Sequence, residues 1–412
     1  MIPRSFWIYL GSRFCAATAM TLLRATVLLH VWDLTKSELH LGLIGISQFV
    51  PALTLTLVGG AVADAYDRRR IMRLAQLPLL ATGSTLCWLT FSGGMSEHVL
   101  YAAVFANSMA FAFDSPARQA LLPSLVAMDV FPRAVTYSSL ATALAFASGP
   151  ALAGILIAGL GVGWAYAAYV ALVALNLFGL GFVRAVREVA ERRAPSLQAV
   201  REGLAFVWRN PVVLGCMAID MFAVILGGAT ALLPVYRDLL QIGARGYGIL
   251  ASSLEIGALA MSALLVLRGP FQRAGPALLA AVTVYGIATI VFGVSRWFPL
   301  SIAAYMMVGM ADQVSVVIRQ TLVQLSTPDA LRGRVSAVNM IFIQASNQLG
   351  AAESGFLAAA TSPTFAVVFG GVGALVVVAV TAWRLPELRR YRIGPAGTPL
   401  PIIVPTTMMS AM

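Results

Sequence analysis

Long apolar segments recur along the whole chain, and they constrain its fold more than any other feature. A hydrocarbon core about 30 Å thick takes roughly 20 apolar residues of helix. Twelve segments of about this length are predicted, at residues 6–32, 41–63, 74–92, 99–117, 134–158, 164–183, 211–236, 246–267, 276–294, 299–318, 335–358 and 365–383. The sequence therefore predicts an all-α membrane protein with twelve transmembrane helices in two pseudo-symmetric six-helix bundles.

The composition excludes a water-soluble fold. Of the 412 residues, 59% are hydrophobic and only 11% are charged. A soluble globular chain is about 45 to 50% apolar and about 25% charged. The apolar surplus cannot fit inside a water-soluble core, so it must face lipid.

The distribution of basic residues predicts the orientation. Placing the N-terminus inside leaves 22 basic residues at cytoplasmic ends, 4 outside and 2 within the first helix. Positive residues that flank short loops are retained in the cytoplasm. We therefore expect a multi-pass protein of a bacterial inner membrane with both termini cytoplasmic. The net charge of +11 is read as topological, because the basic residues form no single patch that would bind nucleic acid.

Four parts of the chain are expected. Residues 1–183 form an N-terminal six-helix bundle, and its first segment is read as a retained helix because it lacks a clear cleavage site. Residues 184–209 form a cytoplasmic linker, in which RAVREVAERRAP at 184–195 is predicted to be an amphipathic surface helix. Residues 210–384 form a C-terminal six-helix bundle, and 385–412 form a cytoplasmic tail that is predicted to be flexible.

An internal repeat relates the two halves. Residues match at a constant offset of 201, in the pairs Arg118/Arg319, Gln119/Gln320, Arg133/Arg334, Gly149/Gly350 and Gly154/Gly355. The matches keep one register across a loop and the helix that follows it. Parallel repeats of this kind are typical of secondary transporters.

The connection between the second and third segments carries a motif. It reads GGAVADAYDRRR from Gly59 to Arg70, and it resembles the G-x-x-x-D-x-x-G-R-R signature of the major facilitator superfamily. Gly60, Asp64, Arg68 and Arg69 match that signature. A small Gly60 would let helices approach closely, and Asp64 could accept hydrogen bonds from a helix N-terminus.

The resemblance implies a latch at the cytoplasmic gate. Asp114 is the expected partner of Arg68, and Asp64 completes the cluster. The repeated arginines Arg118 and Arg334 lie at the same cytoplasmic ends and belong with this latch. The alternatives are a basic loop that only sets topology, and a helix cap at Asp114.

Further stretches indicate which branch of the superfamily the chain resembles. Gly149, Pro150 and Gly154 in the fifth segment are similar to a motif of the exporting drug/proton antiporters, although an ordinary packing kink would look the same. The stretches 113–123 and 328–335 resemble the branch that contains the enterobactin exporter and multidrug efflux proteins. This branch implies alternating access around a central cavity and outward transport of an amphipathic small molecule in exchange for protons.

Ionisable residues inside the apolar segments are candidates for substrate or proton binding, because such a group costs at least about 2.5 to 3.5 kcal/mol at the bilayer centre. The candidates are Arg13, Arg24, Asp220, Glu255, Asp312 and Glu353, together with the polar Gln344 and Gln348. In the superfamily, the first, fourth, seventh and tenth helices line the central cavity. This resemblance favours Arg13, Arg24, Asp220 and Asp312 as the residues that face the substrate.

Alternatives stay open for each of these groups. Arg13, Asp220 and Asp312 lie in the cytoplasmic half, where they could form structural ion pairs instead. Glu255 lies nearest to the middle of the membrane and is the first choice for a protonated carboxylate. Gln344 and Gln348 form either a cavity wall or polar contacts between helices. The arginines of the first helix hint at an anionic substrate, but a buried ion pair would leave the same pattern.

The sequence predicts a transporter and no enzyme. It has no phosphate-binding loop, its cysteines have no metal or redox spacing, and no cofactor is expected. The first hypothesis is proton-coupled efflux of a drug-like or siderophore-like molecule by a monomer that contacts membrane lipids. Uptake of a nutrient or lipid is the second, and a non-transporting receptor on the same fold is the third.

Overall fold

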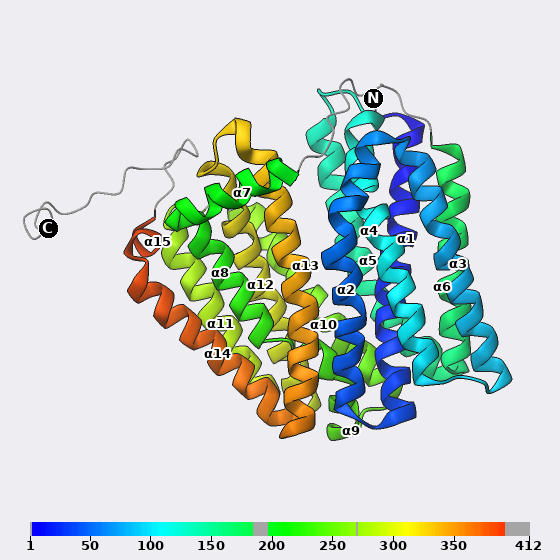
Figure 1. Ribbon diagram of the computed structural model, residues 1–412. Coiled ribbons are helices and arrows are strands. Elements are labelled where there is room, and N and C mark those ends of the chain that lie inside the picture. The colour runs from blue at the N-terminus through cyan, green and yellow to red at the C-terminus, as the bar shows by residue number, and fades with distance from the viewer. Residues whose placement is uncertain (1, 184–196, 269–270, 392–412) are drawn as a thin grey trace, which may run out of the picture.

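The computed structural model describes residues 2–183, 197–268 and 271–391, which are almost entirely helical (Figure 1). The helices are α1 Arg4–Thr35, α2 Glu38–Ala65, α3 Arg68–Ser92, α4 Glu97–Leu125, α5 Phe131–Leu160, α6 Val162–Phe182, α7 Leu197–Arg209, α8 Pro211–Leu226, the 3₁₀ turn η1 Ala229–Leu232, α9 Leu233–Leu239, α10 Gly243–Arg268, α11 Ala274–Val294, α12 Phe298–Leu325, α13 Asp329–Ala360, α14 Pro363–Arg384 and α15 Pro386–Arg390.

Twelve of the helical segments have the length of a membrane span. Ten are long and apolar enough to cross a bilayer on their own, counting α8, η1 and α9 as one span from Pro211 to Leu239. The other two are the more polar helices α4 and α13, of 29 and 32 residues. The twelve predicted spans are thus confirmed.

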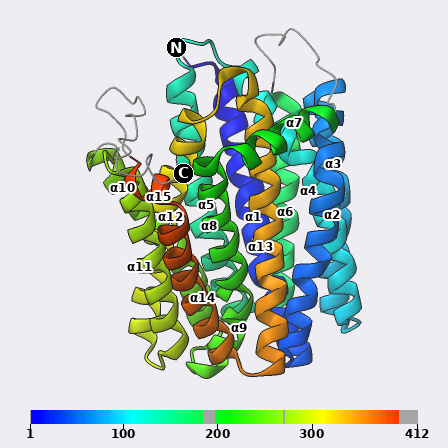
Figure 2. The same cartoon turned by 60° about the vertical axis from the view of Figure 1, so that its left-hand side comes forward.

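The twelve spans form two bundles of six. Figure 1 shows α1–α6 on one side and α8 and α11–α14 on the other, with α9 and α10 where the two sides meet. The N-terminus, α7 and α15 lie at one end of the molecule, which we call the basic end. The α1–α2 connection and α9 lie at the opposite end, where the bundles contact each other, and we call this the closed end. Figure 2 shows α7 across the basic end, against α8 and α13.

The repeated glycines make equivalent helix contacts in the two halves. A Cβ atom on Gly149 would collide with Thr21 of α1, and one on Gly350 would collide with the backbone of α8, so each glycine packs its helix against the first helix of its own bundle. One turn or more further on, Gly154 and Gly355 instead face the other bundle. The internal repeat thus records two kinds of close helix contact, within and between halves.

Gly154 and Gly355 bring the two bundles into contact near the closed end. A Cβ atom on Gly154 would lie 2.6 Å from the Cα of Gly248 on α10, and one on Gly355 would overlap the backbone of Gly42 on α2. These are contacts of backbone against backbone, where no flexible side chain can move aside. Of the predicted helix-kink element of α5, Gly154 therefore serves as a contact between halves, while Gly149 packs on α1 within its own half.

The linker and the tail differ from expectation in part. The segment 184–195, predicted to be an amphipathic helix, lies outside the described residues, but α7 directly after it is amphipathic. Its Val207 is buried while Trp208 and Arg209 are exposed. The predicted flexible tail begins too early at 385. Leu388 is buried, and the Gly275 N–H donates to the Tyr391 carbonyl at 3.2 Å, so residues up to 391 pack on α11.

Candidate functional site

Charged residues link the two halves at the closed end. The Arg237 guanidinium on α9 donates to both carboxylate oxygens of Asp33 on α1, with Nη2–Oδ1 2.6 Å and Nη1–Oδ2 3.0 Å. Lys36 bridges Asp33 and Asp238, at 3.1 Å to each. The Trp32 indole N–H also donates to Asp238 Oδ2, at 2.7 Å. We call Asp33, Lys36, Arg237 and Asp238 the closed-end tetrad.

A further hydrogen bond between the halves lies deeper. The Tyr247 hydroxyl on α10 donates to the Ala25 carbonyl on α1 at 2.9 Å, and Tyr247 is buried. Among described residues, the bonds of the tetrad, the bond from Trp32 to Asp238 and this bond all join the halves. All of them involve the half of α1 that adjoins the closed end.

A pocket lies between the halves beside this bond. Arg24 of α1 and Gln48 of α2 line it from the N-terminal half, and Gln348 of α13 lines it from the C-terminal half. Ile44 and Ala231 contribute apolar surface. We call this space the interbundle pocket. The predicted candidates Arg24 and Gln348 are therefore brought together.

Arg24 is exposed although most of its neighbours on α1 are buried. Among the residues that the structure describes, it forms no hydrogen bond and no ion pair. It lies within electrostatic range of Glu255 on α10, which in turn lies within range of Asp312 on α12. Arg24 and the acidic groups of the other half thus face one another without direct contact.

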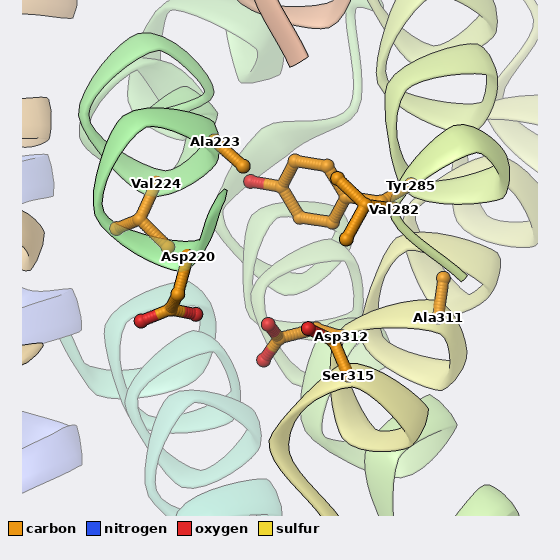
Figure 3. Close-up of a pocket in the computed structure, with 8 residues that line it drawn as sticks. All are labelled: Asp220, Ala223, Val224, Val282, Tyr285, Ala311, Asp312 and Ser315. Carbon is orange, nitrogen blue, oxygen red and sulfur yellow. The ribbon is translucent and has the colours of Figure 1, made fainter. Parts of the chain in front are cut away.

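A second pocket lies inside the C-terminal bundle (Figure 3). Asp220 of α8 and Asp312 of α12 lie opposite each other across it, and Tyr285 and Ser315 complete its polar lining. Asp220 forms an ion pair with Arg319, whose side chain is only 3% exposed. The alternative of a structural ion pair thus holds for Asp220, with Arg319 as its partner in place of Arg13, which bonds to Thr142 instead.

The N-terminal half contains a matching buried arginine. Arg118 of α4 donates through Nε to Asp114 Oδ2 at 2.9 Å and through Nη2 to Oδ1 at 3.0 Å. The Gln76 amide of α3 donates to the same carboxylate at 3.0 Å. Arg118 and Arg319 are related by the repeat, yet their carboxylate partners come from different helices. Both arginines were expected at loops, but α4 and α12 extend beyond them.

The expected pair between Arg68 and Asp114 is not formed in this conformation. Arg68 Nη1 donates to the Ala120 carbonyl at 2.8 Å, because Asp114 already pairs with Arg118 on its own helix. Asp64 is not among the residues whose side chains the structure describes. A predicted close approach at Gly60 is also wrong. A Cβ atom there would meet open space, whereas Gly59 packs against the backbone of α4.

The rest of the motif caps a helix. Asp67 stands where the superfamily usually has glycine, and its Oδ1 accepts from the Arg69 N–H at 2.8 Å at the start of α3. Burial alone would raise the pKa of Asp67, but the hydrogen bonds from Arg69 hold that pKa below its ordinary value. Asp67 and Arg69 thus fix the turn between α2 and α3 without a glycine.

The remaining candidates lie apart from both pockets. Arg13 Nε donates to the Thr142 hydroxyl of α5 at 2.8 Å, which is a contact within the N-terminal bundle. Arg334 pairs with Glu202 of α7 at the basic end. Gln344 lies one helical turn from Gln348 on α13, and Glu353 accepts a long hydrogen bond of 3.4 Å from Ser354.

Sequence reasoning missed three groups. Gln48 carried a signal, since it is a polar residue within an apolar span. Arg319 was visible only as a member of the repeat. The closed-end tetrad gave no signal, because its members lie near the ends of spans, where charged residues are ordinary.

Known proteins resemble this chain over almost its whole length. A sequence profile described as "Transmembrane secretion effector" matches residues 7–398. The enterobactin exporter EntS of Escherichia coli O139:H28 (strain E24377A / ETEC) is 27% identical over 394 residues, which cover 93% of this chain and 92% of the exporter. EntS of Escherichia fergusonii shows the same identity and coverage.

Solved structures share the fold at low sequence identity. A mutant of the nucleoside transporter NupG has a TM-score of 0.73 at 12% identity and covers 92% of this chain and 99% of its own. The peptide transporter POT in complex with sulfate has a TM-score of 0.73 at 13% identity, with 94% and 95% covered. The human organic anion transporter MFSD10 has a TM-score of 0.65 at 14% identity, with 92% and 100% covered.

Proposed function

Because the chain belongs to the transmembrane secretion effector family of the major facilitator superfamily, we propose that it exports an amphipathic small molecule across the bacterial inner membrane in exchange for protons. The similarity to EntS, an enterobactin exporter by its name, supports the outward direction. The observation that carries the mechanism is the location of the hydrogen bonds that described residues form between the halves, which lie toward the closed end.

The proposed sidedness follows from the arginines. With both termini in the cytoplasm, the basic end faces the cytoplasm and the closed end faces the outside. The described conformation would then receive substrate from the cytoplasm, while the closed-end tetrad blocks its exit. Release requires the tetrad to separate and the basic end to close, and we assign the Asp64, Arg68 and Asp114 cluster to that second state.

Charge balance between the pockets supports proton coupling. Three carboxyl groups and two guanidinium groups line the two pockets or interact with groups that do, namely Glu255, Asp312 and Asp220 with Arg24 and Arg319. If all five were ionised, the group would carry one net negative charge. A net charge inside a membrane protein is costly, and one bound proton removes it. Asp312 lacks an ion pair among described residues, and with Glu255 it is a candidate to hold that proton.

Dye accumulation in bacteria that lack their own efflux pumps tests the proposal. Cells that express the wild type should accumulate less of a fluorescent amphipathic dye than cells with an empty vector, and a protonophore should abolish the difference. Asp312→Asn removes the titratable carboxyl group and should accumulate as much dye as protonophore-treated cells. The matched control is Asp129→Asn, at an exposed carboxyl outside the helices, which should behave like the wild type.

Two outcomes would contradict the proposal. Higher accumulation with the wild type than with the vector would indicate uptake, which was the second hypothesis from the sequence. Normal export by Asp312→Asn and by a Glu255→Gln variant would exclude both carboxyl groups from proton coupling. Expression of every variant in the membrane is measured on the same cells.

A further inference from the structure

Arg24 is a positive charge deep in the protein without a bound partner. It lies 20 residues after the start of α1 and 11 before its end, which places it about 30 Å from the basic end and about 16 Å from the closed end. At such depth an unpaired guanidinium is expensive unless water or an anion solvates it. Its exposed side chain faces the interbundle pocket, which therefore has to supply that partner.

The other side chains of the interbundle pocket fit the two parts of an amphipathic anion. The Gln48 and Gln348 amides can donate hydrogen bonds to oxygen atoms beside a charged group. Leu28, Ile44 and Ala231 offer apolar surface for the rest of the molecule. A guanidinium binds a planar oxyanion with two parallel hydrogen bonds, a geometry that ammonium groups lack.

We propose that the interbundle pocket binds the anionic oxygen group of the substrate through Arg24, with Gln48 and Gln348 as neutral hydrogen-bond donors. This inference rests on the proposed transport function and names its substrate class, an organic acid with an apolar body. Because Gln48 and Gln348 come from opposite halves, the ligand contacts both bundles at once. No acidic side chain pairs with Arg24 among described residues, so the guanidinium is free to receive the anion.

Binding of a matched pair of fluorescent probes tests the inference. The probes are 7-diethylaminocoumarin-3-carboxylate and its ethyl ester, which differ in the charge of one group. Fluorescence anisotropy is measured on purified protein in nanodiscs, with empty nanodiscs as the blank. Arg24→Gln should weaken binding of the acid by about 10- to 100-fold, because a hydrogen bond to a charged group is lost. Binding of the ester should change by less than about threefold, since the ester carries no charge for Arg24 to bind.

Three further variants distinguish loss of the Arg24 charge from general damage to the fold. Arg24→Lys keeps the charge without the planar fork and should bind the acid more tightly than Arg24→Gln does. Gln348→Leu should weaken acid binding by roughly threefold to tenfold through one lost hydrogen bond. Arg245→Gln is the control, since Arg245 is exposed near the closed end and outside the pocket. The melting temperature of Arg24→Gln should stay close to that of the wild type, because among described residues Arg24 forms no hydrogen bond or ion pair and only lies within electrostatic range of Glu255.

Several results would overturn the inference. They are absence of acid binding to the wild type, equal acid affinity of the wild type and Arg24→Gln, and an equal loss for acid and ester. The assay needs no ion gradient, so its outcome is independent of the dye-export experiment. Arg24-dependent acid binding without export would refute the proposed function and leave the binding site standing, and the reverse result would do the opposite.

Discussion

Removal of the Arg237 guanidinium should loosen the closed end. Arg237→Gln eliminates the two-pronged pair with Asp33, the strongest link of the closed-end tetrad by geometry, and its pair with Asp238. The side chain of Asp33 is 36% exposed, so solvent screens the pair, and each ion pair is taken as only about 0.5 to 1 kcal/mol. Only the pair with Asp33 joins the halves, since Asp238 is the next residue on α9. Its loss of about 0.5 to 1 kcal/mol corresponds to a change of roughly 2- to 5-fold in the equilibrium between closed and open states.

The size of this shift makes it measurable. If the closed end of the wild type is open in about 10% of molecules, the variant opens it in roughly 18 to 36%. Electron-spin distance measurements can resolve such a fraction. Spin labels are placed at Leu39 and Leu239, which are exposed at the closed end on opposite halves, after the three native cysteines are replaced by serine.

Arg296 supplies the matched control. It also lies at the closed end, but its guanidinium donates to Thr364 at 2.6 Å and to nearby carbonyls, all within the C-terminal half. Arg296→Gln should leave the distance distribution of the wild type unchanged. An Arg237→Gln distribution that matches the wild type would refute the assignment of the closed-end tetrad as a gate. An equal change in both variants would mean that loss of any arginine at the closed end loosens the protein, and not loss of the contact between the halves in particular.

Two more predictions concern packing and buried charge. Gly154→Leu should also open the closed end in the same distance assay, because its side chain has no room against α10, whereas Gly159→Leu on the same helix meets open space and should not. Arg319→Met leaves the buried Asp220 without its partner. It should lower the free energy of unfolding by about 3 to 5 kcal/mol, which a lower melting temperature in detergent would show. The double variant with Asp220→Asn should recover most of that loss, and a double variant as unstable as Arg319→Met would contradict the pairing.

The fold was predictable because lipid imposes a simple rule on sequence. Each span needs enough apolar residues to cross the bilayer, so recurring apolar segments indicate where the helices lie. The repeat at an offset of 201 then shows which residues of the two halves are equivalent. The glycines at 149 and 154 and their equivalents give the physical reason for these matches. Each repeated glycine permits a helix contact that any larger side chain would prevent.

The charged contacts were less predictable because helix ends are hard to place. Ending the fourth segment at residue 117 left Arg118 in a loop and made Arg68 the natural partner of Asp114. In the structure α4 continues to Leu125, through Pro116 and Pro123, so Arg118 is one turn away from Asp114 on the same helix. An error of two helical turns thus changed the predicted ion pair.

The proposed anion site and the closed-end tetrad are joined through one helix, α1. Arg24 and the α1 residues of the closed-end tetrad lie on the same uninterrupted helix, with Asp33 nine residues beyond Arg24. The Tyr247 bond between the halves accepts at Ala25, directly beside Arg24. An anion that binds Arg24 and Gln348 together adds a contact between the halves at this point. A ligand shifts the conformational equilibrium only by its difference in affinity between the two states. If opening the closed end separates Arg24 from Gln348, release of the anion and opening of the gate become one event.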